Sequence, residues 1–310
     1  MMVTKYSIAV VLLNFNSERD LLSSFKQVKK QKGIELITIV VDNASQRETI
    51  RAIKKWPETT VPTSFIGSTN ELHELISSSE LGVETYSTYF IFNDENNGYS
   101  AGNNIGIKIA DYLDADAILI VNPDMRLEDE NYILELAETL FSDKSYVVAS
   151  SRIIGLDGQE QNPLRELYFY EELFWPRTMF PKIFKNTSCV TPYERDQVQT
   201  IKKTSGCCML LRTNFLRGIG YLDENTFLYS EEPILAKQVQ QKNKVIVFNP
   251  KISAVHAHKE SEKGNNSQRM LLFIESRKYY LKKYSEYNRT QLILLSLSYS
   301  VLAILHKIRE

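Results

Sequence analysis

The sequence has few cysteines and almost no excess charge, and each shortage excludes a class of protein. Its 310 residues include three cysteines, Cys189, Cys207 and Cys208. They leave no paired disulfide framework, and the adjacent Cys207 and Cys208 are badly placed for a structural bridge, so we expect a reducing compartment. The formal net charge of −1 argues against a dedicated nucleic-acid binder, because such proteins usually carry a basic surplus.

A long apolar segment is also missing near the N-terminus. The apolar stretch there ends at Asn14, so it is too short and wrongly flanked for a signal peptide or a membrane span. We therefore expect the protein to act in the cytoplasm. With 43% apolar and 24% charged residues, the chain can bury a large core, and we expect one elaborated α/β domain, or one domain with an appendage.

Two common phosphate-binding motifs are absent. Neither G-x-G-x-x-G nor G-x-x-x-x-G-K-[ST] occurs, which argues against a dehydrogenase and a P-loop NTPase. Instead, Gly98, Gly102 and Gly106 are spaced four apart in a bend that also contains Asn96 and Asn103. A strand, a tight loop and a helix beginning here would present backbone N–H groups to a phosphate. The alternative is a helix that packs tightly against a sheet through small residues.

Apolar runs that end in polar residues recur in this part of the chain. Between predicted helices, we expect strands over 7–13, 34–41, 89–92 and 118–121. Such alternation predicts a mostly parallel sheet with helices on both faces, and ligands bind such sheets outside the carboxyl ends of the strands. The polar residues at these four ends are Asn14 and Asn16, Asp42 and Asn43, Asn96 and Gly98, and Asn122, Pro123 and Asp124. Their positions predict a shared nucleotide site.

Two carboxylates and one histidine are candidate ligand contacts. Asp42 ends an apolar strand, where it either accepts a hydrogen bond from a pyrimidine N–H or caps the next helix. Asp124 follows an apolar strand and suits Mg²⁺ or Mn²⁺ against a diphosphate, because hard cations take carboxylate and phosphate oxygens. Alternatively, the Asn-Pro-Asp tripeptide only forms a turn. His256 either completes the metal shell, contacts the leaving diphosphate or is structural.

Seven short motifs follow one another along the chain. They are Leu13-Asn14-Phe15-Asn16, Val41-Asp42-Asn43-Ala44-Ser45, the segment from Asn96 to Gly106, Asn122-Pro123-Asp124, Gly206-Cys207-Cys208-Met209-Leu210, Leu222-Asp223-Glu224 with Phe227 to Glu232, and Val255-His256 with Ser261. In this order they resemble the family 2 glycosyltransferases, particularly the rhamnosyltransferase-like branch of bacterial surface polysaccharide synthesis. The resemblance covers about residues 6–285 and is weaker over 56–88 and 157–200.

The resemblance implies a GT-A fold, which is an α/β fold with a Rossmann-like, mostly parallel sheet flanked by helices. It also implies inverting transfer of a sugar from a nucleotide diphosphate to an acceptor hydroxyl. The nucleotide-sugar site that we predict comprises Asn14, Asn16, Asp42, Asn43, Asn96, Gly98, Gly102, Asn103 and Asn122. Asp124 and His256 are the predicted ligands of Mg²⁺ or Mn²⁺. Asn122 stands where the family usually has a second metal carboxylate, which removes one charged ligand.

Two adjacent glutamates are the candidate catalytic base. Inversion needs a carboxylate within hydrogen-bond reach of the acceptor hydroxyl, to take its proton during attack on the anomeric carbon. Glu231 and Glu232 begin a predicted helix, and Pro233 suits its first turn. By the resemblance, Glu232 occupies the place of the family's catalytic Asp, and Glu231 is the second candidate. The alternative is that both acids only complement the helix dipole.

Three further segments carry predictions of structure. We expect residues 57–88 to form a surface insertion and the predicted strand 244–248 to end at a turn formed by Asn249 and Pro250. We expect Cys207 and Cys208 to serve in packing, because no second cysteine pair stands at zinc spacing.

The C-terminal segment favours contact with a membrane surface. Residues 278–284 mix lysine with tyrosine, and the apolar run 292–305 is shorter than the ~20 residues of a membrane span. These features are typical of an interfacial helix on an anionic leaflet. A core helix or a homodimer helix is the alternative. We therefore divide the chain into a GT-A domain over 1–265, with donor and acceptor halves meeting near residue 125, and a C-terminal helical segment over 266–310.

The predicted function is an inverting glycosyltransferase on the inner face of the plasma membrane. Its donor is dTDP-rhamnose or a UDP-hexose, and its acceptor is a saccharide or a lipid-linked saccharide of a bacterial surface polysaccharide. A non-catalytic sugar-nucleotide-binding subunit is the alternative, since Glu replaces Asp at the base. A nucleotidyltransferase is less well supported, because the chain has no glycine-rich N-terminal loop followed by a basic residue.

Overall fold

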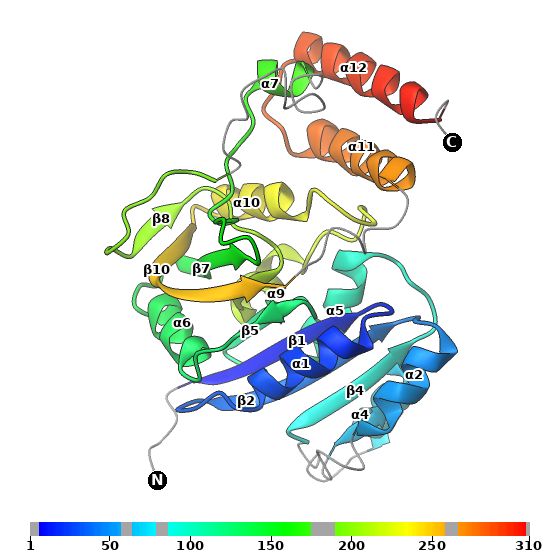
Figure 1. Ribbon diagram of the computed structural model, residues 1–310, viewed down its shortest axis with the longest axis vertical. Coiled ribbons are helices and arrows are strands. Elements are labelled where there is room, and N and C mark those ends of the chain that lie inside the picture. Colours follow the sequence, from blue (N-terminus) through cyan, green and yellow to red (C-terminus); the bar gives the residue numbers. More distant parts are fainter. Residues whose placement is uncertain (1–5, 57–63, 79–85, 175–189, 258–265, 308–310) are drawn as a thin grey trace.

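The computed structural model describes residues 6–56, 64–78, 86–174, 190–257 and 266–307. Within these residues one ten-stranded sheet has the order β3-β4-β2-β1-β5-β9-β7-β10-β6, and β8 pairs with β10 (Figure 1). The strands are β1 (Ser7–Asn14), β2 (Glu35–Asn43), β3 (Phe65–Gly67), β4 (Thr88–Asn93), β5 (Ala117–Val121), β6 (Met125–Arg126), β7 (Tyr146–Gly155), β8 (Gln199–Ile201), β9 (Cys208–Arg212) and β10 (Val245–His256). The helices are α1 (Glu18–Val28), α2 (Arg47–Lys54), α4 (Thr69–Ser78), α5 (Tyr99–Tyr112), α6 (Tyr132–Phe141), α7 (Phe169–Leu173), α9 (Thr213–Ile219), α10 (Glu231–Gln241), α11 (Asn266–Lys283) and α12 (Arg289–Lys307).

The predicted sheet, mostly parallel with helices on both faces, is confirmed. Strands β3, β4, β2, β1 and β5 are parallel neighbours, and β7 is parallel to β10. Strand β9 runs antiparallel between β5 and β7. Strands β6 and β8 also pair with β10 in the antiparallel sense. Successive side chains of a strand point to opposite faces, so each buried central strand packs against a helix layer on either side.

Two apolar layers enclose the sheet. One contains Leu21 of α1, Ile53 of α2 and Leu136 of α6. The other contains Ile107 of α5 and Leu235 of α10, together with side chains from α4 and α9. Helices from both halves of the chain therefore cover one continuous sheet, and the carboxyl ends of β2, β1 and β5 lie at the same edge.

The predicted surface insertion over residues 57–88 is wrong where the structure describes it. Strand β3 pairs with β4 and extends the sheet, and Leu72 of α4 is 4% exposed. Three residues are too few to show the alternation that marks a strand in a sequence. The rest of the insertion, 57–63 and 79–85, lies outside the described residues.

The turn predicted at Asn249 and Pro250 is also wrong. Strand β10 continues through both residues to His256, and it pairs with β7 on each side of a register irregularity between Asn249 and Ser253. Proline lacks a backbone N–H to donate, so it is tolerated where the ladder is interrupted. The continuation carries His256 to the edge that also holds Asp124.

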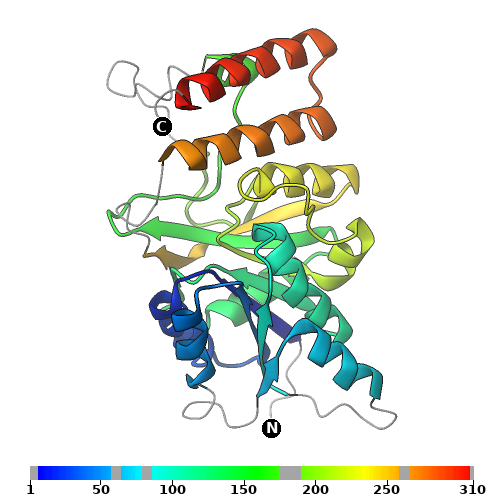
Figure 2. The same cartoon turned by 90° about the vertical axis from the view of Figure 1, so that its right-hand side faces the viewer.

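The C-terminal helices form a separate layer. In Figures 1 and 2, α11 lies between α10 and α12. One side of α12 packs through Leu295, Tyr299 and Leu302 into a cluster with α11 and α7. The other side exposes a row of apolar side chains, Ile293, Leu294, Leu297, Val301, Ile304 and Leu305. Among the described residues, α12 is the one helix with the length and hydropathy of a membrane span.

Candidate active site

The first polar cluster lies where β1 and β2 end side by side. Asn14 and Asp42 are register partners, and Asn14 Nδ2 donates to Asp42 Oδ1 over 2.7 Å. Asp42 Oδ2 accepts from the Ser45 N–H over 3.0 Å, and both Asn14 and Asp42 are fully buried. Asp42 therefore orders the strand ends from inside the protein, and its contact with a nucleobase stays a prediction.

Amide side chains continue this network into the loops. Asn16 lies in the left-handed region with φ 55°, and its Oδ1 accepts from the Gln46 N–H over 2.7 Å. Asn43 Nδ2 donates to Asn96 Oδ1 over 2.8 Å, and the same Asn96 oxygen accepts from the Gly98 N–H over 3.0 Å. The loops after β1, β2 and β4 thus form one hydrogen-bonded rim around Asn14, Asn43 and Asn96, which we call the amide rim.

The glycine spacing has a packing explanation at Gly102 and Gly106. A Cβ at Gly102 would lie 2.6 Å from Leu13 Cδ1, and one at Gly106 would lie 2.6 Å from Val11 Cγ1. Asn103 is fully buried, and its Nδ2 donates to the Tyr99 carbonyl over 3.0 Å. Close packing of α5 against β1 therefore explains these small residues, and the ligand contacts of Gly102 and Asn103 stay predictions.

Asp124 and His256 come together through an antiparallel pair of strands. His256 of β10 is the register partner of Met125 in β6, and the Ala257 N–H donates to the Asp124 carbonyl over 2.8 Å. His256 Nε2 then lies 3.2 Å from Asp124 Oδ2, and Nδ1 lies 2.7 Å from Gln161 Oε1. The short β6 strand thus joins two residues that are 132 positions apart in sequence.

This pair fits a divalent cation. With Gln161 Oε1 as acceptor, Nδ1 carries the ring proton, and the Nε2 of a neutral ring presents its lone pair to the Asp124 carboxylate. Two ligands at right angles with bonds of about 2.1 Å would lie about 3 Å apart, close to the spacing found here. Within the described parts of the chain, no three His, Cys, Asp or Glu side chains group as metal ligands, so a diphosphate and water would supply the other positions.

The turn after β5 connects this pair to the predicted base. The Asn122 N–H donates to the Cys207 carbonyl over 2.8 Å, at the start of β9. Burial raises the pKa of Cys207 most, and the charges of Asp124 and Glu232 raise it further. The negative charges of both carboxylates therefore disfavour ionisation of the same buried thiol. The packing role predicted for Cys207 and Cys208 is confirmed, since both are buried and neither is in a disulfide.

The two glutamates occupy different surroundings at the start of α10. Glu232 Oε1 accepts from the Gly206 N–H over 3.3 Å, whereas Glu231 Oε1 is buried without a hydrogen-bond partner in the described structure. Burial raises the pKa of Glu231 to about 8, and the neighbouring charge of Glu232 adds to the effect. Burial and both carboxylates also raise the pKa of Tyr99 well above its ordinary value. Its hydroxyl donates to the Gly206 carbonyl over 2.6 Å.

Sequence reasoning missed two residues beside these groups. Gln161, which holds His256, lies in a stretch without a motif, and no sequence signal marks it. Lys203 lies in electrostatic reach of Glu232, and burial lowers its pKa. Lys203 stands three positions before the motif that begins at Gly206, so no motif marks it. Ser261, which belongs to the same motif as His256, and Cys189 lie outside the described residues.

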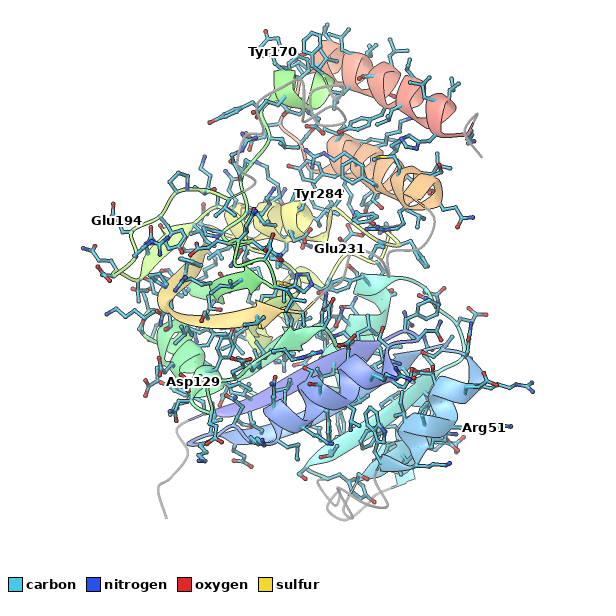
Figure 3. All side chains as sticks on the ribbon, viewed as in Figure 1. Arg51, Asp129, Tyr170, Glu194, Glu231 and Tyr284 are labelled. Atoms are coloured by element: carbon cyan, nitrogen blue, oxygen red, sulfur yellow. The ribbon has the colours of Figure 1, made fainter. Side chains whose placement is uncertain are left out.

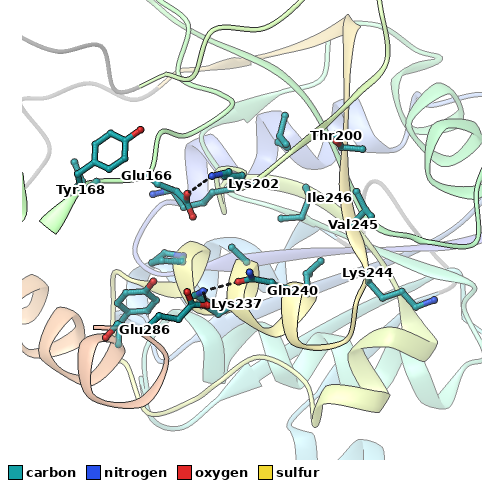
Figure 4. A pocket seen from close by; sticks show the side chains of 18 of the residues that line it. Glu166, Tyr168, Thr200, Lys202, Lys237, Gln240, Lys244, Val245, Ile246 and Glu286 are labelled. Carbon is teal, nitrogen blue, oxygen red and sulfur yellow. Dashed lines mark hydrogen bonds and ion pairs between the residues drawn. The ribbon is translucent and has the colours of Figure 1, made fainter. Parts of the chain in front are cut away.

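A cavity of about 670 Å³ lies beside α10, the helix that begins at Glu231 (Figure 4). It is bordered by α10, β8, β10 and α11, and Lys203 and Pro233 are among its lining residues. Ion pairs cross or line it, such as Lys202 with Glu166 at 3.3 Å. None of the predicted nucleotide-site residues lines it, so it is distinct from the rim of amides.

Comparisons with known proteins agree with this architecture. No family model matches the chain. The low-salt glycan biosynthesis hexosyltransferase Agl10 of Haloferax volcanii is 25% identical over 252 residues, which cover 80% of this chain and 66% of that protein. The chain thus spans slightly under two thirds of that relative's length.

Solved structures are similar in fold. The mannosyltransferase PcManGT from Pyrobaculum calidifontis, in complex with GDP-Man and Mn²⁺, superposes with a TM-score of 0.58 at 14% identity, over 96% of this chain and 70% of that one. GalNAc-T7 with UDP, GalNAc and Mn²⁺ gives 0.58 at 12% identity over 91% and 48%, and S. aureus TarS 1–349 gives 0.51 at 12% over 95% and 70%. The chain has the GT-A glycosyltransferase fold that the sequence predicted.

Proposed function

We propose that this protein is an inverting glycosyltransferase that uses a nucleotide diphosphate sugar and a divalent cation. The observation that carries the proposal is the pair of Asp124 and His256, 3.2 Å apart, joined to Glu232 through backbone contacts. Glu232 accepts from the Gly206 N–H, and the carbonyl of the next residue, Cys207, accepts from the Asn122 N–H in the turn that holds Asp124. A cation ligand pair near a carboxylate base suits transfer from a diphosphate to a hydroxyl. The hexosyltransferase relative and the fold of the structural neighbours support the same activity.

Each residue has a role in the proposed reaction. Asp124 and His256 would hold Mg²⁺ or Mn²⁺, which when bound neutralises charge on a leaving diphosphate. Glu232 takes the proton of the acceptor hydroxyl. The acceptor oxygen forms its bond to the anomeric carbon on the face opposite the diphosphate, and the bond from that carbon to the diphosphate oxygen breaks with its electron pair. Because burial favours a proton on Glu231, we assign the base to Glu232.

We propose a hexose donor. The relative is named a hexosyltransferase, and two neighbours were solved with GDP-Man or with UDP and GalNAc. A dTDP-rhamnose donor, favoured by the motif set, is the competing choice.

We also propose that the protein works at a membrane surface on a saccharide or lipid-linked saccharide acceptor. The exposed apolar row of α12 supports this placement, and Arg289, Lys282 and Lys307 supply cations near it. Such a helix lies in the interface, with its apolar side toward the acyl chains. Flotation with anionic vesicles tests this, and replacement of Leu297 and Val301 by Ser should abolish it.

A binding panel and one substitution test the function. We expect a nucleotide sugar with Mn²⁺ to raise the melting temperature more than either alone, with release of the nucleoside diphosphate on incubation. Glu232→Gln should abolish that release and keep the thermal shift. If the wild type binds but never turns over, and Glu232→Gln is indistinguishable from it, the protein is instead a non-catalytic sugar-nucleotide-binding subunit.

A further inference from the structure

The segment that leads into the predicted base has an unfavourable backbone. Tyr229 and Ser230, directly before Glu231, have φ angles of 74° and 66°. The left-handed region is unfavourable for residues with a Cβ. Two such residues in succession persist only where the surroundings impose them. We call residues 223–230 the base loop, because its geometry sets where Glu232 lies.

At its first residue the base loop is clamped to α11 by one buried carboxylate. Asp223 Oδ2 accepts hydrogen bonds from Tyr279 Oη at 2.8 Å, Lys283 Nζ at 3.0 Å and Tyr284 Oη at 2.5 Å. Its Oδ1 accepts from the backbone N–H and the Nδ2 of Asn225. Five donors therefore share two oxygens, and they hold the pKa of Asp223 below its ordinary value in spite of its burial.

Near its end the base loop is held by α11 a second time. Ser276 Oγ donates to the Leu228 carbonyl over 2.7 Å, and Arg269 Nε donates to Tyr229 Oη over 3.0 Å. The Tyr229 ring meets Phe273 edge to face, with centroids 5.9 Å apart. Figure 3 shows Tyr284 and Glu231 in the layer between α11 and the sheet.

The opposite side of the base loop is fixed by the start of α5. The Tyr99 N–H donates to the Phe227 carbonyl over 2.8 Å. A Cβ at Gly98 would lie 2.2 Å from that same oxygen, and Gly98 has φ 97°, so only glycine fits. The base loop is thus held between the first turn of α5 and the length of α11.

We propose that α11 is a brace for the catalytic base and that Asp223 is its positioning residue. The inference rests on the proposed function, in which Glu232 is the base. Asp223 touches no reacting atom in this scheme. It acts by keeping the base loop in its strained form, so that the first turn of α10 presents Glu232 beside Gly206.

A second clamp on α11 provides a matched control. Glu172 of α7 is buried and accepts from Arg277 of α11 and from Tyr299 Oη of α12 at 2.9 Å. Like the Asp223 clamp, it joins a carboxylate to a cation and a tyrosine of the C-terminal helices. It has no hydrogen bond to the base loop among the described residues. Loss of either clamp should loosen the helices, but only one should move Glu232.

The experiment compares Asp223→Asn with Glu172→Gln in the full chain. An amide in place of the Asp223 carboxylate turns one acceptor oxygen into a donor, so some of the five donors lose their partner. We expect kcat to fall between roughly tenfold and a hundredfold, while the Kd for UDP-sugar with Mn²⁺ stays unchanged. Glu172→Gln should lower the melting temperature and leave kcat unchanged. Equal kcat losses in both variants, or none in Asp223→Asn, would overturn the brace.

Two milder variants keep the test decisive if Asp223→Asn does not fold. Ser276→Ala removes the bond to the base loop, and Ser298→Ala removes a bond of the same kind, 2.9 Å from Ser298 Oγ to the Leu173 carbonyl. Only Ser276→Ala should lower kcat.

Hydrogen exchange separates the brace from the proposed function. Amides of residues 223–232 should exchange faster in Asp223→Asn than in Glu172→Gln, whether or not the wild type turns over. Absence of turnover with this difference intact would refute the enzyme and keep the brace. Unchanged exchange beside an active wild type would refute the brace alone.

Discussion

The amide rim and the base side of the site, which comprises the base loop with Glu231 and Glu232, are built in opposite ways. The rim consists of loops after neighbouring parallel strands, joined by the amides of Asn14, Asn43 and Asn96 around one buried aspartate. The base side consists of a strained loop, two adjacent glutamates and a clamp from Asp223 to Tyr279 and Lys283 of α11. The rim is ordered by the sheet itself, whereas the base depends on a helix outside the sheet.

This difference has a consequence for how each side fails. Hydrogen bonds between neutral amides contribute modestly one by one, and their neighbours in the sheet hold the strands in place. A buried carboxylate that loses its donors is more costly, and a base displaced by about 1 Å costs catalysis steeply. Single substitutions in the amide rim should therefore lower turnover less than single substitutions on the base side.

The largest effect is expected at Glu232. Glu232→Gln should lower kcat by about 10²–10⁴-fold, the usual contribution of a positioned general base. Donor affinity, measured by titration calorimetry with Mn²⁺, should stay within error of the wild type. A variant that retains turnover would move the base to another residue, with Glu231→Gln as the comparison.

The next effect concerns the cation pair. Asp124→Asn should weaken Mn²⁺-dependent donor binding by more than about tenfold, because it replaces a charged ligand by a neutral one. The exposed Asp196→Asn serves as the control and should leave binding unchanged. Donor binding that is the same with Mn²⁺ and with EDTA in the wild type would exclude the cation role of Asp124 and His256.

A third prediction tests the rim as a packed structure. Gly102→Ala should lower the free energy of unfolding by about 1–3 kcal/mol, because its Cβ would lie 2.6 Å from Leu13 Cδ1. Gly218→Ala is the matched control in α9, where a Cβ meets nothing within 4 Å, and it should raise stability by roughly 0.5–1 kcal/mol. If chemical denaturation finds Gly102→Ala as stable as the wild type, α5 is packed less tightly than described.

The last prediction concerns the pH dependence of stability. The folded-state pKa of Glu231 is raised from 4.5 to about 8, so the folded state keeps a proton that the unfolded chain has released. The free energy of unfolding should therefore fall as pH rises from 4.5 toward 8. Glu231→Gln removes this group and should reduce the slope, measured by urea denaturation across that range. Parallel curves would mean that Glu231 is less buried in solution.

The sequence by itself determined the parallel strands β1, β2, β4 and β5 and the polar residues at their four ends. These depend on local apolar patterns and on the rule that parallel strands share a carboxyl edge. It also identified Asp124, His256 and the Glu231–Glu232 pair as candidates, through motifs. It did not determine which of the rim residues point inward. The same glycine spacing suits a phosphate or a packed helix, and the tertiary structure adds that a Cβ at Gly102 would lie 2.6 Å from Leu13 Cδ1, which supports close packing.

Only the tertiary structure decided how the two sides of the site are assembled. The β6 and β10 pairing joins Asp124 to His256, and Gln161 enters from a segment with no motif. The clamp on Asp223 was invisible in the sequence, because Tyr279, Lys283 and Tyr284 looked like a basic and aromatic membrane signal. Local patterns specify elements through neighbours in the chain, while a hydrogen bond between distant residues depends on how those elements pack.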